Sequence, residues 1–230
     1  MPFVRKIMLL VHPIACLAAV RVPSARMAVP ASTATTPVFH YKAIEVATGE
    51  GEELIPAQEI SLVDLTPALN NLVRESGVVE GTLHCVSRHT TTALTINEME
   101  TRLQDDIRRW LFTMAAPDVR YPIPGWTAAP GATAPTYDHN DLHLRPASEE
   151  DRARIDKNWM SQGKGTLQEF MDQEPINAHS HLLTMLLGTS LSIPISAGEL
   201  CIGQWQSVIL VDCDGPRKRT VGAQVVGLRD

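Results

Sequence analysis

Three clusters of polar side chains interrupt the apolar segments of this sequence, and each could do chemistry. The first is the run RHTTT at residues 88–92, followed by Asn97 and Glu98. An imidazole beside several hydroxyl groups offers hydrogen-bond donors suited to phosphate or carboxylate oxygens. Threonine is also common in strands for packing reasons alone, so the run could equally be ordinary strand sequence.

The second cluster joins the run YDHND at residues 137–141 to Asn177, His179 and His181. Asn177 and His181 are four positions apart, so a helix would place them on one face while His179 points elsewhere. Neutral imidazoles near a carboxylate are typical ligands of Zn²⁺, Mn²⁺ or Fe²⁺. A polar loop and a helix with one hydrated face would explain the same residues without a metal ion.

The third cluster is the run DCDGPRKR at residues 212–219. Asp-Gly-Pro indicates a turn between two strands. In one interpretation Arg217 and Arg219 project from one strand face and bind a phosphate group, while Asp212 and Asp214 serve a metal ion. In the other, the run is the hydrated tip of a hairpin.

The elements around these clusters predict a mixed fold. Alternating or continuous apolar residues predict strands at 39–48, 78–89, 190–196, 199–213 and 219–228, and an extended segment before residue 66. Helices are predicted at 66–76, from Met99 to before Pro117, and at 176–187, with a charged surface helix capped by Ser148. Hairpins interrupted by two to three packed helices predict an α+β fold with a mostly antiparallel sheet in a single compact domain.

Two of the predicted helices carry more detailed expectations. Thr66 is expected to be the N-cap of the first helix, with Pro67 in its first turn and Gly77 at its end. In the helix after Met99, the residues that recur at helical spacing are Leu103, Ile107, Trp110 and Leu111.

Composition excludes several classes of protein. The chain has 230 residues, 44% of them hydrophobic and 20% charged, which is enough to bury a single core. Twenty basic residues against 26 acidic ones give a net charge of −6, which argues against a nucleic-acid partner. Because no apolar run reaches about 18 residues, a membrane-spanning helix is not expected. The four cysteines form no CxxC pair and lie in or near apolar runs, which indicates buried thiols.

Residues 1–37 differ from the rest of the chain. They hold four basic residues and no acidic one, and an apolar stretch is followed by many Ala, Ser and Thr residues. Such a start is typical of an organelle transit peptide, and the apolar stretch also resembles part of a secretory signal. We therefore expect a leader at 1–37, a domain at 38–230, and a location in the chloroplast or mitochondrion after leader removal. A disordered tail or a misassigned start codon would leave the protein in the cytoplasm.

Four motifs resemble the YjbQ family, and they occur in the same order as in that family. They are RHTTTALTINE from residue 88, YDHND from 137, NAHSHLLTMLLGTSLSIPISAGEL from 177 and IGQWQSVILVDCDGPRKRTV from 202. The family is described as secondary thiamine-phosphate synthases, small α+β proteins that form trimers. The resemblance covers the chain from about residue 39 to its end, and it implies a homotrimer with its site near the subunit boundaries.

The resemblance also implies roles for particular residues. Catalytic roles fall on His89, Thr90, Thr91 and Glu98, binding of substrate or phosphate on Asn97, Asn177, Trp205, Arg217 and Arg219, and a divalent metal ion (zinc, magnesium or manganese) on His139, His181 and Asp212. The implied reaction joins a hydroxymethylpyrimidine pyrophosphate to a thiazole phosphate and releases pyrophosphate. A metal-dependent hydrolase or phosphatase, and a trimeric protein that binds a metabolite without catalysis, are the alternatives.

The chain departs from the family pattern in three places. His139 and His181 are 42 positions apart, where compact members have a short loop, so we expect an inserted segment at about residues 143–172 that covers the site. Asp212 stands where the family usually has glutamate, which shortens the reach of this carboxylate. His179 adds an imidazole that could join the expected metal ligands.

Overall fold

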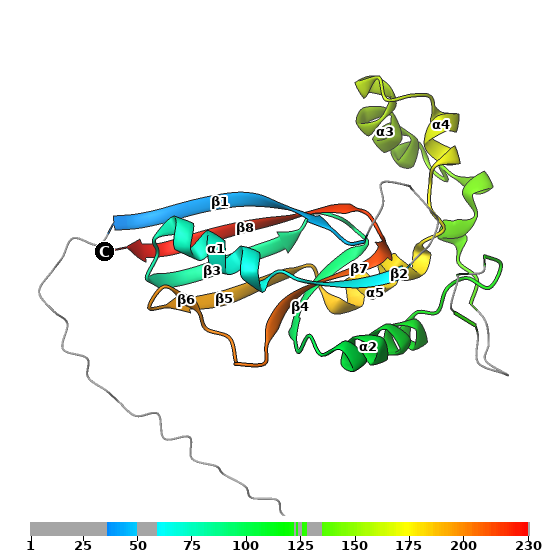
Figure 1. Ribbon diagram of the computed structural model, residues 1–230. Coiled ribbons are helices and arrows are strands. Elements are labelled where there is room, and N and C mark those ends of the chain that lie inside the picture. Colours follow the sequence, from blue (N-terminus) through cyan, green and yellow to red (C-terminus); the bar gives the residue numbers. More distant parts are fainter. Residues whose placement is uncertain (1–35, 50–58, 122, 124–125, 128–134, 230) are drawn as a thin grey trace, which may run out of the picture. The chain divides into compact units, whose positions relative to one another are not determined.

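The computed structural model describes residues 36–49, 59–121, 123, 126–127 and 135–229. The predicted leader, apart from its last two residues, lies outside this part of the chain. The described residues belong to one unit, residues 34–230, and contain two antiparallel sheets with helices packed on them (Figure 1). The predicted α+β class with mostly antiparallel strands is therefore confirmed.

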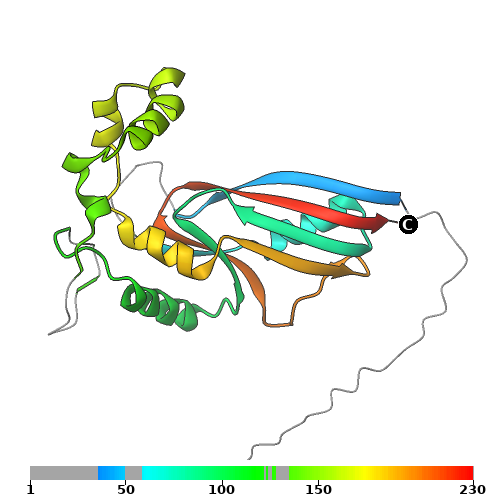
Figure 2. The ribbon, with the colours of Figure 1, turned by 180° about the vertical axis from the view of Figure 1, so that it is seen from behind.

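Sheet A has five strands in the order β1-β8-β3-β5-β6. They are β1 (Thr36–Ala47), β8 (Lys218–Arg229), β3 (Glu80–Ser87), β5 (Ser190–Ser196) and β6 (Glu199–Leu200). Helix α1 (Thr66–Ser76) packs its buried leucines on one face of this sheet. Seen from behind, the opposite face of β1, β8, β3 and β5 has no described helix over it (Figure 2).

Sheet B has three strands in the order β2-β7-β4. They are β2 (Glu59–Asp64), β7 (Ser207–Gly215) and β4 (Thr92–Asn97). Along β7, Val208 and Leu210 pack with α1 and sheet A, whereas Ile209 and Val211 pack in a second core. Buried residues of α2 (Thr101–Met114) and α5 (Ala178–Leu187) complete that second core. A strand buried on both faces explains why β7 is a continuous apolar run.

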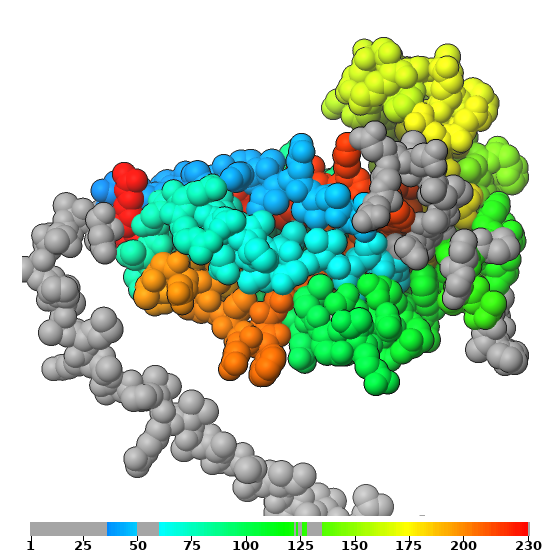
Figure 3. Space-filling model, viewed as in Figure 1, coloured from blue at the N-terminus to red at the C-terminus, as the bar shows by residue number. Residues whose placement is uncertain are grey.

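The segment between α2 and α5 holds two short helices and three 3₁₀ turns. They are η1 (Asp138–Asn140), η2 (Leu142–Leu144), α3 (Glu149–Asn158), η3 (Met160–Gln162) and α4 (Leu167–Asp172). Ser148 Oγ accepts a hydrogen bond from the Asp151 N–H, so the predicted N-cap of α3 is confirmed. In the space-filling view, α1 lies in front of part of sheet A, and β1 stays visible above it (Figure 3). None of the described helices is both long and apolar enough to cross a membrane.

Several sequence details were wrong, each for a local reason. Leu65, not Thr66, is the N-cap of α1, because Thr66 Oγ1 instead accepts a hydrogen bond from the Val208 N–H at 2.8 Å. On α2 only Leu111 is fully buried, and Trp110 is 52% exposed. The segment predicted as one strand at 199–213 is two strands, β6 and β7, with a turn between them. Helix α4 was not predicted, because the charged stretch was expected to form one surface helix, and Cys201 is exposed rather than buried.

Candidate functional site

Five segments of the chain meet at one pocket of about 450 Å³. They are the turn between β3 and β4, the turn η1, Arg145 after η2, the stretch from α4 to the start of α5 and the hairpin between β7 and β8. The pocket is lined by Arg88, His89, Thr90, Thr91, His139, Arg145, Phe170, Glu174, Pro175, Asn177, His181, Asp214, Arg217 and Arg219. Most residues predicted from the three polar clusters are therefore brought together.

His89 is fixed by the neighbouring strand. Its Nε2 accepts a hydrogen bond from the backbone N–H of Thr220 on β8 at 2.8 Å. Burial, and then the nearby Arg219, lower the pKa of His89. The neutral ring must therefore carry its proton on Nδ1, because Nε2 is an acceptor. His89 can donate a hydrogen bond to an anion, but its Nε2 lone pair is already used.

His139 and His181 form a close pair at the pocket. Their ring centroids are 4.9 Å apart with the rings at 73°, so one ring meets the other edge-on. Burial is the main cause that lowers the pKa of both rings, and Arg145 lowers both further. A hydrogen bond from His181 to the backbone carbonyl of Thr90 raises the pKa of His181 and so opposes these two effects. The same hydrogen bond fixes the position of the His181 N–H. In the neutral form the other His181 nitrogen keeps a free lone pair.

The start of α5 is tied to the end of β7. Asn177, the N-cap residue of α5, is buried and its Nδ2 donates to Asp214 Oδ2 at 2.9 Å. Burial raises the pKa of Asp214, which is only 3% exposed. Arg217 Nη2 lies 3.4 Å from Asp214 Oδ1 and partly offsets this effect. The carboxyl group of Asp214 therefore faces the pocket as a group that protonates more readily than an ordinary aspartate.

Asp212 does not join the histidine pair. Its fully buried carboxylate accepts from Arg219 Nε at 2.8 Å, from Arg219 Nη2 at 2.6 Å and from Thr48 Oγ1 at 2.6 Å. Within the described residues, no three His, Cys, Asp or Glu side chains are grouped so that they could hold a metal ion. The pair His139 and His181 alone offers fewer ligands than the three of a catalytic zinc site. The predicted three-residue metal set is therefore not assembled, because Asp212 is committed to Arg219.

Three further predicted residues lie elsewhere. β4 begins at Thr92, which pairs with Asp212, and ends at Asn97, which pairs with Ser207. A strand of this length spans roughly 17 Å, so Asn97 and the adjoining Glu98 stand at the end of β4 remote from the pocket. Trp205, two residues before Ser207, is 72% exposed. The structure brings none of these three to the pocket.

Comparison with known proteins shows the family of this chain. The family model described as "UPF0047 protein YjbQ-like" matches residues 52–228. The chain belongs to the YjbQ family. A UPF0047 protein of Methanothermobacter thermautotrophicus is 29% identical over 171 residues, which cover 74% of this chain and 86% of that protein. The protein YugU of Bacillus subtilis is 22% identical over 81% of this chain and 98% of its own length.

Solved structures show the same fold. A YbjQ-like protein of unknown function from Sulfolobus solfataricus P2 has a TM-score of 0.53 and 23% identity, over 84% of this chain and 99% of that one. A hypothetical protein from Aeropyrum pernix K1 also has a TM-score of 0.53, with 25% identity, over 81% of this chain and 98% of that one. No activity is named for either structure. These structures therefore support the fold, and a reaction has to be inferred from the residues of the site.

A buried network holds the η1 turn of this YjbQ-family chain, and the sequence did not reveal it. The Asp118 carboxylate accepts from Arg120 Nη2 at 2.7 Å, from the Tyr137 N–H at 3.1 Å and from Asn140 Nδ2 at 3.1 Å. Burial alone would raise the pKa of Asp118, but these hydrogen bonds lower it. Asn140 Oδ1 in turn accepts from the Ala178 N–H at 3.1 Å, at the first turn of α5. Asp118 follows a helix in an irregular segment, and nothing in its local sequence distinguishes it.

His179 is separate from the pair that lines the pocket. It is 1% exposed, and its ring centroid lies 6.2 Å from that of Phe112 on α2. Burial lowers the pKa of His179 to about 4. Because its ring faces the helix α2 rather than the pocket, His179 is not placed to replace His139 or His181 as a ligand.

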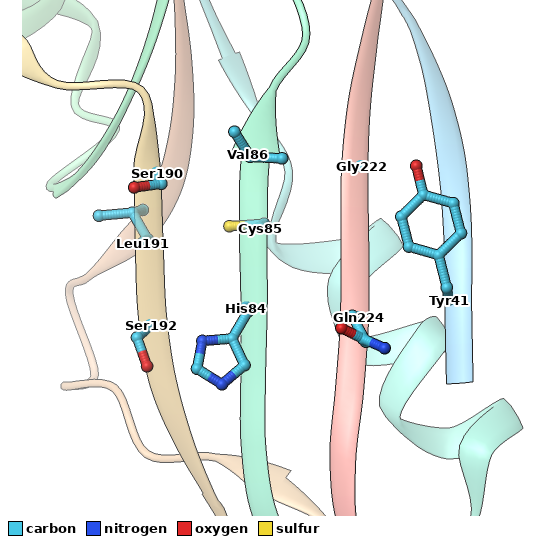
Figure 4. A pocket seen from close by; sticks show the side chains of 9 residues that line it. All are labelled: Tyr41, His84, Cys85, Val86, Ser190, Leu191, Ser192, Gly222 and Gln224. Carbon is cyan, nitrogen blue, oxygen red and sulfur yellow. The ribbon is translucent and has the colours of Figure 1, made fainter. Parts of the chain in front are cut away.

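The YjbQ-family chain has another pocket, on the outer face of sheet A. Its volume is also about 450 Å³, and Figure 4 shows Tyr41, His84 and Gln224 across its strands. It has no carboxylate or guanidinium group among its lining residues. None of the predicted site residues lies there, so the pocket of the three polar clusters is the better candidate for chemistry.

Proposed function

We propose that this YjbQ-family protein binds phosphorylated metabolites in the pocket that contains His89 and Arg217, called the cationic pocket below. We propose that it acts there as a transferase of the thiamine-phosphate synthase type. The observation that carries this proposal is the set of charged groups around one cavity. Four arginines line it, against the carboxylates of Asp214 and Glu174, and three histidines of lowered pKa add neutral hydrogen-bonding groups. Arginine is the side chain best suited to grip phosphate oxygens, since its planar fork can donate two parallel hydrogen bonds.

The proposed reaction suits these groups. A thiazole nitrogen forms a bond to the methylene carbon of the pyrimidine as the carbon–oxygen bond to pyrophosphate breaks. The step needs charge neutralisation on the leaving pyrophosphate, alignment of the two rings and exclusion of water. Arg217 and the His89 Nδ1–H would stabilise the pyrophosphate. The reaction needs no thiol nucleophile. Burial raises the pKa of Cys85 to about 11, so this thiol is not activated as a nucleophile.

The test is turnover by the full chain with both phosphorylated substrates. We expect product, and we expect His89→Gln and Arg217→Gln each to lower kcat/KM by roughly a hundredfold, the usual effect of removing one such donor. Arg109→Gln is the matched control, because Arg109 is exposed on α2 and pairs with the neighbouring Asp106. Absence of product from folded wild-type protein would refute the reaction, and unchanged rates in both site variants would refute the pocket.

A metal-dependent hydrolase is the second candidate, and one observation favours it. The His181 N–H is held by a backbone carbonyl, which is how many metal-binding histidines are oriented. Elemental analysis of the wild type and of a His139→Ala/His181→Ala variant distinguishes the candidates. About one transition metal ion per chain, lost in a folded variant, would favour the hydrolase. No metal in either protein would favour the transferase or a non-catalytic metabolite-binding protein.

A further inference from the structure

We propose that the segment between η2 and α4 builds a second binding subsite, which accepts the planar ring of a ligand whose phosphate occupies the cationic pocket. This inference rests on the proposed function for the phosphate end of the ligand. The subsite is a cavity of about 310 Å³ that has its own lining and adjoins the cationic pocket. A cavity of this size is large enough for a single ring with its substituents.

The two cavities are neighbours. His139, Arg145 and Phe170 line both of them. A ligand that occupies both cavities would therefore contact these three side chains. Arg145 stands at this junction with its charge partly balanced, because its Nη1 lies 2.8 Å from Glu174 Oε2. A phosphate oxygen at the junction would meet the same guanidinium group.

The walls of the second cavity differ in chemistry from those of the first. Pro146, Ile155 and Phe170 provide carbon surface. The Phe170 ring is held in place by Trp159, with ring centroids 5.6 Å apart at 66°. Such an edge-to-face contact fixes the orientation of an aromatic wall. The apolar walls and the fixed Phe170 ring suit a planar ring more than a flexible chain.

Polar groups at the same cavity suit a ring that carries hydrogen-bonding substituents. Asp151 and Arg154 both line the cavity and form an ion pair with each other on α3. The Asp151 carboxylate can accept from an amino group on a ring, and Arg154 can donate to a ring nitrogen or oxygen. The ligand class that fits both cavities is therefore an aromatic or nitrogen-containing ring joined by a short link to a phosphate.

Two simple probes separate the subsite from the cationic pocket. Inorganic phosphate fills only the first cavity, whereas phenyl phosphate adds a ring that can reach the second. Binding of each probe to the full chain is measured by calorimetry. We expect phenyl phosphate to bind roughly tenfold more tightly than phosphate, as burial of one ring face predicts. Ile155→Ala should remove most of this difference and leave the affinity for phosphate unchanged, because Ile155 lines the second cavity and not the first.

Further variants make the result decisive. Phe170→Ala is the second variant, used if Ile155→Ala does not fold, and it should reduce the same preference. Leu144→Ala should not reduce it, because Leu144 is 63% exposed and outside both cavities. Arg217→Gln should weaken both probes alike. Equal affinity of the wild type for the two probes would overturn the subsite and leave the cationic pocket standing. Failure of the wild type to bind either probe would overturn the proposed function as well.

Discussion

Arg219 shows how a single buried charge is positioned in this molecule. Its guanidinium group is held by two hydrogen bonds to Asp212 and by a third, at 2.9 Å, to the backbone oxygen of Asp214. With both partners almost entirely buried, the plane of the guanidinium group is fixed at the wall of the pocket. The aspartate in the family motif therefore positions an arginine, which is a different role from the metal ligand that its sequence context suggests.

The first prediction at this scale concerns the same pair. Asp212→Asn should lower the free energy of unfolding by about 3 to 5 kcal/mol, because it leaves the buried Arg219 charge uncompensated. Urea unfolding followed by circular dichroism measures this loss. Asp106→Asn is the control, since Asp106 pairs with Arg109 in an exposed setting and should cost no more than about 1 kcal/mol. Similar losses in the two variants would contradict a special role for the buried pair.

A second prediction concerns pH and His179. The pKa of this ring is about 4 in the folded protein against an ordinary 6.5, so the unfolded chain binds the additional proton between these values. The stabilisation that this group contributes is fully present above pH 6.5. As the pH falls from 6.5 to 4, the free energy of unfolding decreases by about 3 kcal/mol in total. His179→Phe should remove this component, so its unfolding free energy should fall less steeply than that of the wild type. Parallel curves for the two proteins between pH 7 and 4 would contradict it.

At the scale of elements, strands β3 and β8 approach each other at two facing glycines. Gly81 pairs with Gly227, and a Cβ added to either residue would lie 2.3 Å from a backbone oxygen of the opposite strand. This close approach lets Val78 pack across the pair, since its Cγ1 would lie within 3.0 Å of a Cβ at either position. Only glycine fits here, because the colliding atoms are backbone and cannot rotate away.

Substitution on β8 tests this explanation. Gly227→Ala should destabilise the protein by about 1 to 3 kcal/mol, the usual cost of forcing extra atoms into a packed region. Gly222→Ala on the same strand should stay within about 0.5 kcal/mol of the wild type. There the added Cβ would meet Tyr41 Oη at 2.9 Å, and this side chain is 57% exposed and free to move. Thermal unfolding of both variants measures the contrast, and equal effects would show that backbone approach is not the cause.

Elements also show what the sequence could and could not predict. The helix at α1 and the strands β5, β7 and β8 follow from local periodicity and from turn residues such as Gly77 and Gly215. The sequence grouped Asn97 with the run that contains His89, but the strand β4 lies between them and separates them in the structure. The contacts of Asp118 with Asn140 and of Arg145 with Glu174 were missed because they join segments more than 20 positions apart.

At the scale of the whole molecule, apolar side chains remain exposed on the helix that carries the site. On α5, Leu182, Met185 and Leu186 are 41%, 79% and 57% exposed. Their spacing places them on one helix face, beside the face that buries Leu183. Contiguous exposed apolar side chains commonly mark a protein–protein interface. Since His181 precedes this stripe on the same helix, an interface here would lie next to the pocket.

A homotrimer, which the family resemblance implies, would account for this stripe. We expect the full chain to have three times the mass of one chain by light scattering. Met185→Glu should shift the mass towards that of a single chain, because a charge in an apolar interface must be desolvated on association. Leu144→Glu places the same charge on an exposed residue outside the stripe and should leave the mass unchanged. A wild type with the mass of one chain would refute the trimer, and a trimer that persists in Met185→Glu would move the interface away from α5 and from the pocket.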